Sequence, residues 1–261
     1  MPLFARFRAL PDKDKASLIR KLVENGTPDF DFFYLIGLST LMATLGLLLD
    51  SGSIVIGSML LAPLMYPILG VSMGLVMMGT NTQLLQRALN TLVKSLGVGL
   101  LLSIAAAFFF GGEGTSYLTS EVLARTVPSH LHLLVALVAG AAVSYMLARP
   151  EWGDALPGVA IAVALIPPLA AVGIGIANLD PFLIKGASMI LLLNLFGIIA
   201  IAVMIFLLMN LSEKENIAIS TVKKEDEKKE SEEKVIAEVA EQIIVSKELS
   251  KTTTIKEDIK A

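Results

Sequence analysis

The strongest constraint on this chain is the stretch from Phe32 to Asn210, which carries very few charged side chains. Over the whole sequence 54% of residues are hydrophobic and only 17% are charged, whereas a soluble domain usually carries about 25% charged residues. Long uncharged runs of this kind suit the hydrocarbon core of a bilayer. The sequence therefore predicts an all-α integral membrane protein whose first partner is the lipid bilayer.

Six apolar segments divide this stretch, and each approaches or exceeds the ~20 residues needed to cross a membrane. They cover residues 32–49, 54–78, 89–110, 131–147, 156–177 and 182–209. We therefore expect six transmembrane helices in a domain spanning 32–210. An N-terminal arm (1–31) and a charged, partly disordered tail (211–261) flank it. Within the arm, apolar residues at helical spacing predict an amphipathic helix over 14–24, lying on the membrane surface or packing on another subunit.

The distribution of lysine and arginine predicts the orientation, because cytoplasmic loops carry an excess of both. With the N-terminus inside, most of these residues fall on the cytoplasmic side, and the outer side receives only Arg125 and Lys185. An even number of spans returns the tail to the cytoplasm. No early apolar run resembles a signal peptide, so the first internal segment is expected to direct insertion. We expect a multi-pass protein of the inner (cell) membrane with both termini cytoplasmic.

Two proline-containing segments, 57–70 and 162–175, occupy corresponding places in the second and fifth spans. A shift of 105 residues aligns Pro63 with Pro168. Each segment is the middle of a three-span unit, and because three is odd, two units of one fold must have opposite orientations. The sequence thus predicts two inverted three-helix repeats.

A second, weaker match between the halves points the same way. Lys94-x-x-Gly97 in the third span is similar to Asn194-x-x-Gly197 in the sixth. Its offset of 100 residues rather than 105 requires a shorter loop in the second half.

Proline removes a backbone donor and clashes with the carbonyl four residues earlier, so the second and fifth helices are expected to be kinked or broken. Interrupted segments in corresponding places of two halves indicate a transporter binding site. The alternative is a pair of kinked helices that only pack, since glycine and proline are common in membrane spans. The candidate substrate pathway consists of Gly57, Ser58, Pro63, Tyr66, Pro67, Gly70, Pro167, Pro168, Gly173, Gly175 and Asn194.

Two polar side chains within the spans allow a structural and a functional interpretation. Asn194 is either an amide that joins helices by hydrogen bonding or a group that faces a ligand. Lys94 either extends to the cytoplasmic interface or is buried and functional, which would cost more free energy.

Polar residues at the segment ends are expected mainly to cap helices. Asp50 and, at the analogous place, Asp154 precede apolar segments as capping residues do, although Asp50 is also placed to attract cations outside the membrane. His130 and His132 are expected to be wetted residues at a helix start rather than metal ligands, because no third ligand has a defined spacing.

Several classes of function have no support in the sequence. It contains no cysteine and has a net charge of −3, so disulfides, thiolate metal sites and nucleic-acid binding are not expected. No nucleophile elbow, phosphate-binding loop or zinc-protease motif occurs. We expect no enzyme activity, no cofactor and no metal. Close helix packing, with a homo-oligomer as one option, is expected at the small-residue stretches Gly70-x-x-x-Gly74, 97–103 and 140–142.

The run from Val55 to Gly70 resembles the first signature of a prokaryotic membrane family known only as an uncharacterised hydrophobic domain of unknown function. Residues 158–169 resemble its second signature, and the leucine-rich run to Asn194 its third. The resemblance covers about 33–210 and implies a polytopic inner-membrane protein without a settled substrate. We expect a transporter or channel for a small solute or ion. The alternative is a non-transporting scaffold or sensor that acts through its cytoplasmic tail.

Overall fold

The computed structural model describes residues 11–26, 28–78, 82–111, 116–148, 155–211, 216–231 and 234–236, with 155–164 described by their backbone. The chain divides into two compact units, Met1–Ile219 and Ser220–Ala261. All regular elements among the described residues are helices, as the sequence predicts.

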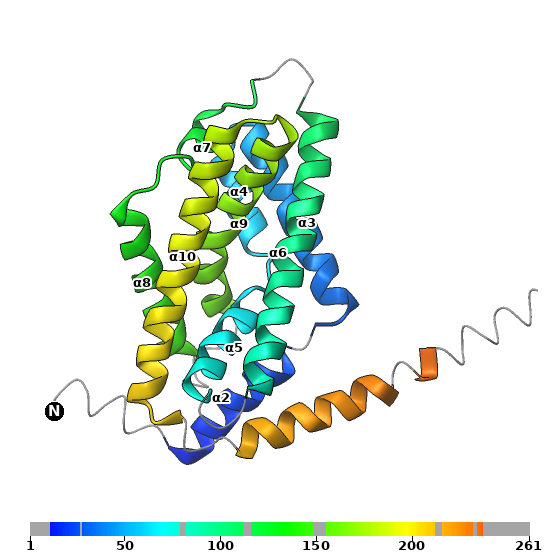
Figure 1. Ribbon diagram of the computed structural model, residues 1–261, viewed down its shortest axis with the longest axis vertical. Helices are drawn as coiled ribbons and strands as arrows, with labels where there is room; N and C mark the ends of the chain where they lie inside the picture. Colours follow the sequence, from blue (N-terminus) through cyan, green and yellow to red (C-terminus); the bar gives the residue numbers. More distant parts are fainter. Residues whose placement is uncertain are drawn as a thin grey trace, which may run out of the picture. The chain divides into compact units, whose positions relative to one another are not determined.

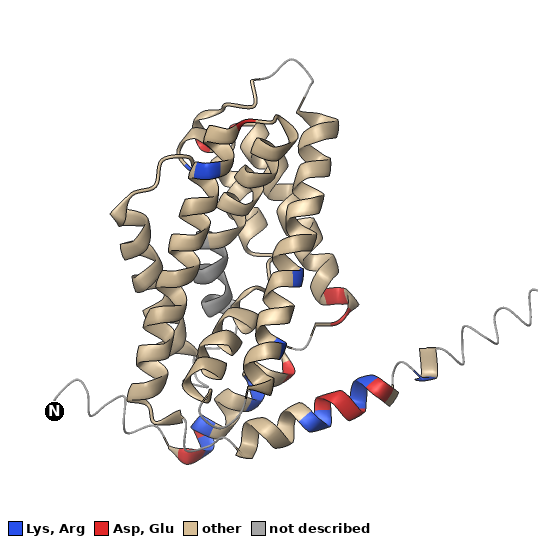
Figure 2. Ribbon diagram, in the orientation of Figure 1, with Lys and Arg blue, Asp and Glu red and all other residues tan. Residues whose placement is uncertain are grey.

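The first unit is a bundle of mostly apolar helices (Figure 1). They are α2 (Asp12–Glu24), α3 (Phe30–Leu48), α4 (Gly52–Met59), α5 (Met65–Val76), α6 (Gln83–Phe110), α7 (Ser120–Leu123), α8 (His130–Leu147), α9 (Ala155–Ala177) and α10 (Pro181–Leu208). Four of the described helices, α3, α6, α8 and α10, are long and apolar enough to cross a membrane. Figure 2 shows charged residues mostly near the two ends of the bundle. These are the features of a membrane-embedded protein.

Short polar residues fix where three of the long helices begin. The Asp29 carboxylate accepts a hydrogen bond from the Phe32 amide at 2.8 Å and caps α3. Asp180 caps α10 in the same way, with Pro181 in the first turn. Ser129 forms a capping box with His132 at the start of α8. Each cap satisfies amides that have no partner within the helix.

The first proline segment is a true break, as predicted. α4 ends at Met59, α5 begins at Met65, and Pro63 lies between them. Pro67 occupies the first turn of α5, where a missing amide costs no helical hydrogen bond. The Ser39 hydroxyl of α3 donates to the Ser58 carbonyl at 2.7 Å. A neighbouring helix therefore satisfies a carbonyl at the broken end, as burial in lipid requires.

The second proline segment is not broken: α9 runs as one helix through Pro167 and Pro168. The fixed φ of proline is compatible with a helix, and α9 contacts α3, α6, α8 and α10, which hold it in place. The Ser103 hydroxyl of α6 donates to the Ala170 carbonyl at 3.0 Å. The expected pair of interrupted helices is therefore one break and one continuous, proline-containing helix.

The crossing of α3, α6 and α9 is built from small and hydroxyl-bearing residues. Buried Thr44 and Ser103 are hydrogen-bonded to each other at 2.8 Å, and Ser103 continues to α9. A Cβ at Gly99 would lie 2.8 Å from a Thr40 methyl group and 2.9 Å from a Leu169 methyl group. Because Gly99 has no side chain, α6 can approach α3 and α9 this closely.

The predicted amphipathic helix of the arm is α2, which begins two residues earlier than expected. It ends before Asn25-Gly26, as predicted. Its apolar residues Leu18, Ile19, Leu22 and Val23 are buried, and the helix contacts α5 of the same chain. This face therefore packs within its own chain rather than on another subunit.

The second unit contains the charged tail. Residues 216–231 are helical, and the boundary between the units falls inside this helix. Within the second unit, Lys234 and Glu230 form an exposed ion pair at 2.9 Å. The mixed-charge run 223–230 is thus helical with mainly exposed side chains. Apolar residues at approximately helical spacing over 232–249 predict either one amphipathic helix or a disordered segment with transient helicity, and most of this stretch lies outside the described residues.

Candidate functional site

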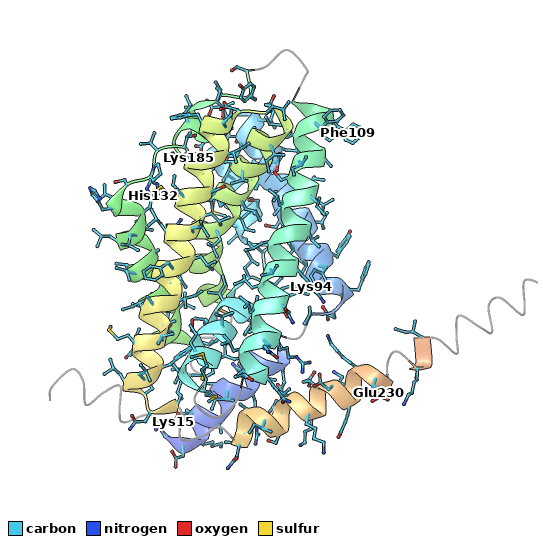
Figure 3. All side chains as sticks on the ribbon, viewed as in Figure 1. Lys15, Lys94, Phe109, His132, Lys185 and Glu230 are labelled. Atoms are coloured by element: carbon cyan, nitrogen blue, oxygen red, sulfur yellow. The ribbon has the colours of Figure 1, made fainter. Side chains whose placement is uncertain are left out.

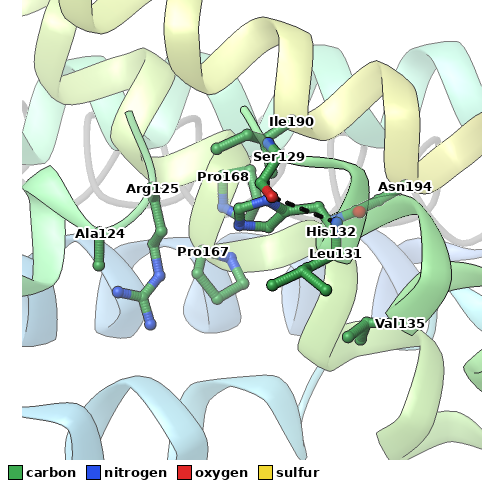
Figure 4. A pocket seen from close by; sticks show the side chains of 10 residues that line it. All are labelled: Ala124, Arg125, Ser129, Leu131, His132, Val135, Pro167, Pro168, Ile190 and Asn194. Carbon is green, nitrogen blue, oxygen red and sulfur yellow. Dashed lines mark hydrogen bonds between the residues drawn. The ribbon is translucent and has the colours of Figure 1, made fainter. Parts of the chain in front are cut away.

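A cavity of about 430 Å³ lies between α8, α9, α10 and the connector from α7 to α8 (Figure 4). Three residues of the predicted pathway, Pro167, Pro168 and Asn194, line it. The remaining lining residues are Ala124, Arg125, Ser129, Leu131, His132, Val135 and Ile190. The cavity is formed by the second half of the bundle together with the connector.

Arg125 supplies the cationic side chain of the cavity wall. Its side chain is 21% exposed, and Nη1 donates to the Glu121 carboxylate at 2.6 Å and to the Glu121 carbonyl. The Glu121 carboxylate lies beside the start of α4, since a Cβ at Gly52 would be 2.8 Å from its Oε1. Glu121 is not among the residues that line the cavity.

His132 is oriented by the cap of α8. Its Nδ1 accepts a hydrogen bond from the Ser129 amide at 3.2 Å (Figure 4). A neutral imidazole that accepts at Nδ1 carries its proton on Nε2. The ring thus combines the predicted helix-end role with a place in the cavity wall.

Asn194 and the two prolines contribute polar groups from α10 and α9. Asn194 is 5% exposed. Pro167 and Pro168 have no amide hydrogen, so the carbonyls of residues 163 and 164 receive no helical hydrogen bond from them. Residues four apart share one helix face, which places these carbonyls on the face that carries the proline rings.

Glycines set the close packing of α10 against its neighbours around the cavity. A Cβ at Gly186 would overlap the Thr126 carbonyl, and a Cβ at Gly140 would lie 2.9 Å from the Ile198 Cα. A Cβ at Gly197 would lie 2.9 Å from the Ala136 Cβ. The predicted packing role of the 140–142 stretch is confirmed at Gly140.

Comparison with known proteins assigns the chain to a family. Residues 59–216 match the family described as "Domain of unknown function (DUF389)". The chain belongs to this family. The matched region begins at the end of α4 and includes every residue that lines the cavity.

The family resemblance predicted from the sequence is therefore confirmed. An uncharacterized protein of Methanocaldococcus jannaschii is 29% identical over 171 residues, which are 65% of this chain and 51% of that protein. The chain thus spans about half the length of this curated relative. No solved structure matches the chain.

The first proline segment does not reach the cavity. Gly57 faces Met42, and the Ser58 hydroxyl donates to the Val55 carbonyl. Tyr66, Pro67 and Gly70 border a space of only about 10 Å³ beside α2 and α6, room for one water at most.

The two remaining pathway candidates serve helix packing. Gly173 lies against Ser103, and Gly175 against Ile184 across the turn from α9 to α10. The structure therefore brings together the second proline segment and Asn194, without the first segment.

The residues that match weakly between the third and sixth spans lie in different surroundings. Lys94 is exposed on α6 (Figure 3), whereas Asn194 is buried. A Cβ at Gly97 would meet no atom within 4 Å, whereas Gly197 packs against α8. The exposure of Lys94 favours its interpretation as an interfacial side chain.

Asp50 is a capping residue, but not for the helix that follows it. Its carboxylate accepts hydrogen bonds from the Ser120 hydroxyl at 2.7 Å and the Glu121 amide at 2.9 Å. These bonds lower the pKa of Asp50 from its ordinary value, the Ser120 bond most strongly. Asp154, its predicted analogue, lies outside the described residues.

Sequence reasoning missed Arg125, Ser129 and His132 as parts of one site. In the sequence Arg125 informs only the orientation, His132 indicates only a helix start, and Ser129 carries no prediction. The available signal was proximity along the sequence. Arg125 lies four residues before the capping residue Ser129, and His132 lies three residues after it. The proximity of that start to α9 and α10 is a tertiary feature that no local pattern encodes.

Proposed function

We propose that this protein moves a small solute or ion across the bilayer and that the cavity beside Pro167, Pro168 and Asn194 is part of its path. The observation that carries the proposal is the convergence of polar groups on a cavity of about 430 Å³ that opens at the side of the apolar bundle, where Leu131 and Val135 are 66% and 57% exposed. Polar groups within a membrane domain are costly unless they face one another or a hydrated space. A cavity that serves solute passage explains their presence.

The proposed topology has six crossings, formed by α3, α4 with α5, α6, α8, α9 and α10. The 23 residues of α9 extend about 35 Å as a helix, enough for a hydrocarbon core of about 30 Å. Six crossings place both termini on the same side, and the lysine and arginine distribution favours the cytoplasmic side of the inner membrane.

The contacts between helices support the proposed inverted repeat. In the first half α3 contacts α6, and in the second half α8 contacts α10. The middle elements contact both flanking helices in each half, and the contact of α6 with α9 has a counterpart in that of α5 with α10. Two features depart from this symmetry. The first half has a break where the second has a continuous helix, and α3 packs on α9 whereas, among the described residues, α8 has no comparable packing on α4 or α5.

Flux through reconstituted vesicles tests the transport proposal. Liposomes loaded separately with radiolabelled sodium, rubidium, chloride and benzoate should release at least one of these probes faster with the protein than without it. Pro168→Leu and Asn194→Leu should each slow that release by about tenfold, the effect of losing about 1.4 kcal/mol. Pro63→Ala should have a smaller effect, since Pro63 lies outside the cavity.

Gly97→Ala is the matched control, because a Cβ at Gly97 meets open space. Release that equals that of protein-free liposomes for all four probes would contradict the proposal. Equal release by wild type and both cavity variants would move the path elsewhere in the bundle.

The alternative function is a scaffold or sensor that acts through the tail. Its support is that residues 220–261 form a second compact unit, which includes most of the charged helix 216–231. Deleting the chain from Ser212 onward discriminates the two functions. If the protein is a transporter, the shortened chain retains most of its flux. If it is a scaffold, the full-length chain shows no flux and the deletion abolishes its cellular phenotype.

A further inference from the structure

The cavity wall combines hydrogen-bond donors with apolar side chains, and this combination indicates the class of ligand. We infer that the cavity binds an organic monoanion, meaning an apolar body that carries one carboxylate or phosphodiester group. This inference rests on the proposed function and names the substrate class of the same site. It also holds for a ligand that binds without being transported.

The donors come from three elements that meet at the cavity. Arg125 has five guanidinium N–H groups, and Glu121 engages only Nη1. His132 offers its Nε2–H, because Nδ1 is held by the Ser129 amide. Asn194 adds a carboxamide from α10. Glu121 balances part of the Arg125 charge from outside the lining, but the lining residues include no Asp or Glu and offer several N–H donors, so the polar part of the wall favours an anion.

The start of α8 adds to this preference. Ser129, Leu131 and His132 belong to the cap and first turn of this 18-residue helix and line the cavity. The N-terminus of a helix carries a partial positive charge of roughly half an elementary charge. It therefore reinforces the Arg125 guanidinium on the same wall.

The rest of the wall suits an apolar body of limited size. Leu131, Val135 and Ile190 are aliphatic, and the two proline rings complete the surface. At about 430 Å³, the cavity lies near the lower end of the 300–1,000 Å³ typical of small-molecule sites. Because the wall has a single arginine, which also pairs with Glu121, the matched ligand carries no more than one negative charge.

Binding of benzoate to the full-length protein tests this inference directly. Isothermal titration would use the protein in nanodiscs of phosphatidylcholine, with benzamide as the uncharged probe of the same shape and benzylammonium as the cationic one. We expect saturable binding of benzoate and at least about tenfold weaker binding of both controls, as loss of a charge-assisted hydrogen bond predicts. Equal binding of benzoate and benzamide would overturn the inference.

Variants locate the ligand in this cavity. Arg125→Gln should weaken benzoate binding by about tenfold or more, and Asn194→Leu by several-fold. His132→Gln keeps an acceptor for the Ser129 amide while removing the imidazole, so it reports on the ligand even if Arg125→Gln fails to fold. Lys185→Gln is the matched control: Lys185 is an exposed cation on α10 outside the cavity (Figure 3). Unchanged affinity in folded His132→Gln and Asn194→Leu would overturn the inference.

A lipid headgroup and a dissolved acid supply the same chemistry, and the nanodisc composition distinguishes them. If phosphatidylglycerol competes with benzoate, the anion comes from the bilayer; if it does not, the ligand is dissolved. Binding without flux would contradict the proposed transport and leave this site standing. If a cation is transported but neither benzoate nor phosphatidylglycerol binds, the transport proposal is supported and this inference is overturned.

Discussion

Gly173 and Gly97 show how one residue type serves different purposes in the same pair of crossing helices. A Cβ at Gly173 would lie 2.5 Å from the Ser103 Cβ, where Ser103 bridges Thr44 and the Ala170 carbonyl. Gly97 faces open space. The glycine at 173 is therefore required by the crossing of α6 and α9, and the glycine at 97 is not.

Gly173→Ala should destabilise the bundle by about 1–3 kcal/mol, the usual cost of inserting a methyl group into a packed interface. Gly97→Ala should be neutral or slightly stabilising, since alanine is the better helix former. Unfolding in mixed micelles by titration with dodecyl sulfate measures both. Equal stability of the two variants would show that the crossing is looser than the structure describes.

The charge of Asp50 should matter for stability at neutral pH. Asn tolerates the positive φ of 52° at this position, so Asp50→Asn tests the charge without straining the backbone. Because the folded-state pKa is lowered, the stabilisation is complete above the ordinary pKa of 3.8 and is lost as the pH falls through the folded value. The variant should therefore melt below wild type near neutral pH.

This difference in melting temperature should shrink as the pH falls below 3.8. Thermal melts of wild type and Asp50→Asn across this range measure it. A difference that stays constant with pH would mean that the carboxylate charge contributes nothing.

At the scale of elements, the sequence predicts which helices exist better than it predicts whether each helix is continuous. The predicted span starts at 32, 131 and 182 lie within two residues of the observed starts of α3, α8 and α10, which the structure shows to be capped by Asp29, Ser129 and Asp180. The two proline segments look alike in sequence, yet only the first interrupts its helix. The difference depends on neighbours, since α9 packs against α3, α4, α5, α6, α8 and α10 and retains its path. Local patterns contain no such information.

The same limit applies to the candidate site. Three of the proposed pathway residues do line the cavity. They could be predicted because a proline-rich helix face and a polar residue in an apolar run are local features of the sequence. The first segment and the cavity lie apart, and Arg125 joins the site only through the packing of its connector on α9 and α10.

The docking of α2 on the bundle is testable as a unit. Leu22 is 2% exposed and lies beside Pro67 and Ala88, whereas Arg20 of the same helix is exposed. Leu22→Ala should weaken docking by about 2–5 kcal/mol and accelerate hydrogen exchange of the α2 amides. Arg20→Ala should leave exchange unchanged. Equal exchange in both variants would contradict a packed α2.

At the scale of the whole bundle, hydrogen bonds tie three connections together at one end. The Thr119 hydroxyl donates to the Leu47 carbonyl at 2.7 Å, and Asp50 caps α7. The Tyr117 hydroxyl reaches Asp180 at 3.5 Å. The turns from α3 to α4 and from α9 to α10 therefore lie beside the α7 connector, on the end that the proposed topology places outside.

The absence of cysteine from the sequence makes this topology directly measurable. Ser53, Ser116 and Ser17 are all exposed, so their cysteine variants form a matched set. A membrane-impermeant maleimide should label the Ser53→Cys and Ser116→Cys variants in intact cells. The Ser17→Cys variant should react only after permeabilisation. Labelling of all three in intact cells would contradict the proposed orientation.

The cap on α7 also has a consequence for the order of events during synthesis. Ser120 follows Asp50 by 70 residues, which a ribosome adds in roughly 4–14 s at about 5–20 residues per second. Throughout this interval the turn after α3 exists without the groups that bind its carboxylate. The ties at this end of the bundle therefore close only after α6 has been made, so the first three apolar segments must hold their places in the nascent chain without them.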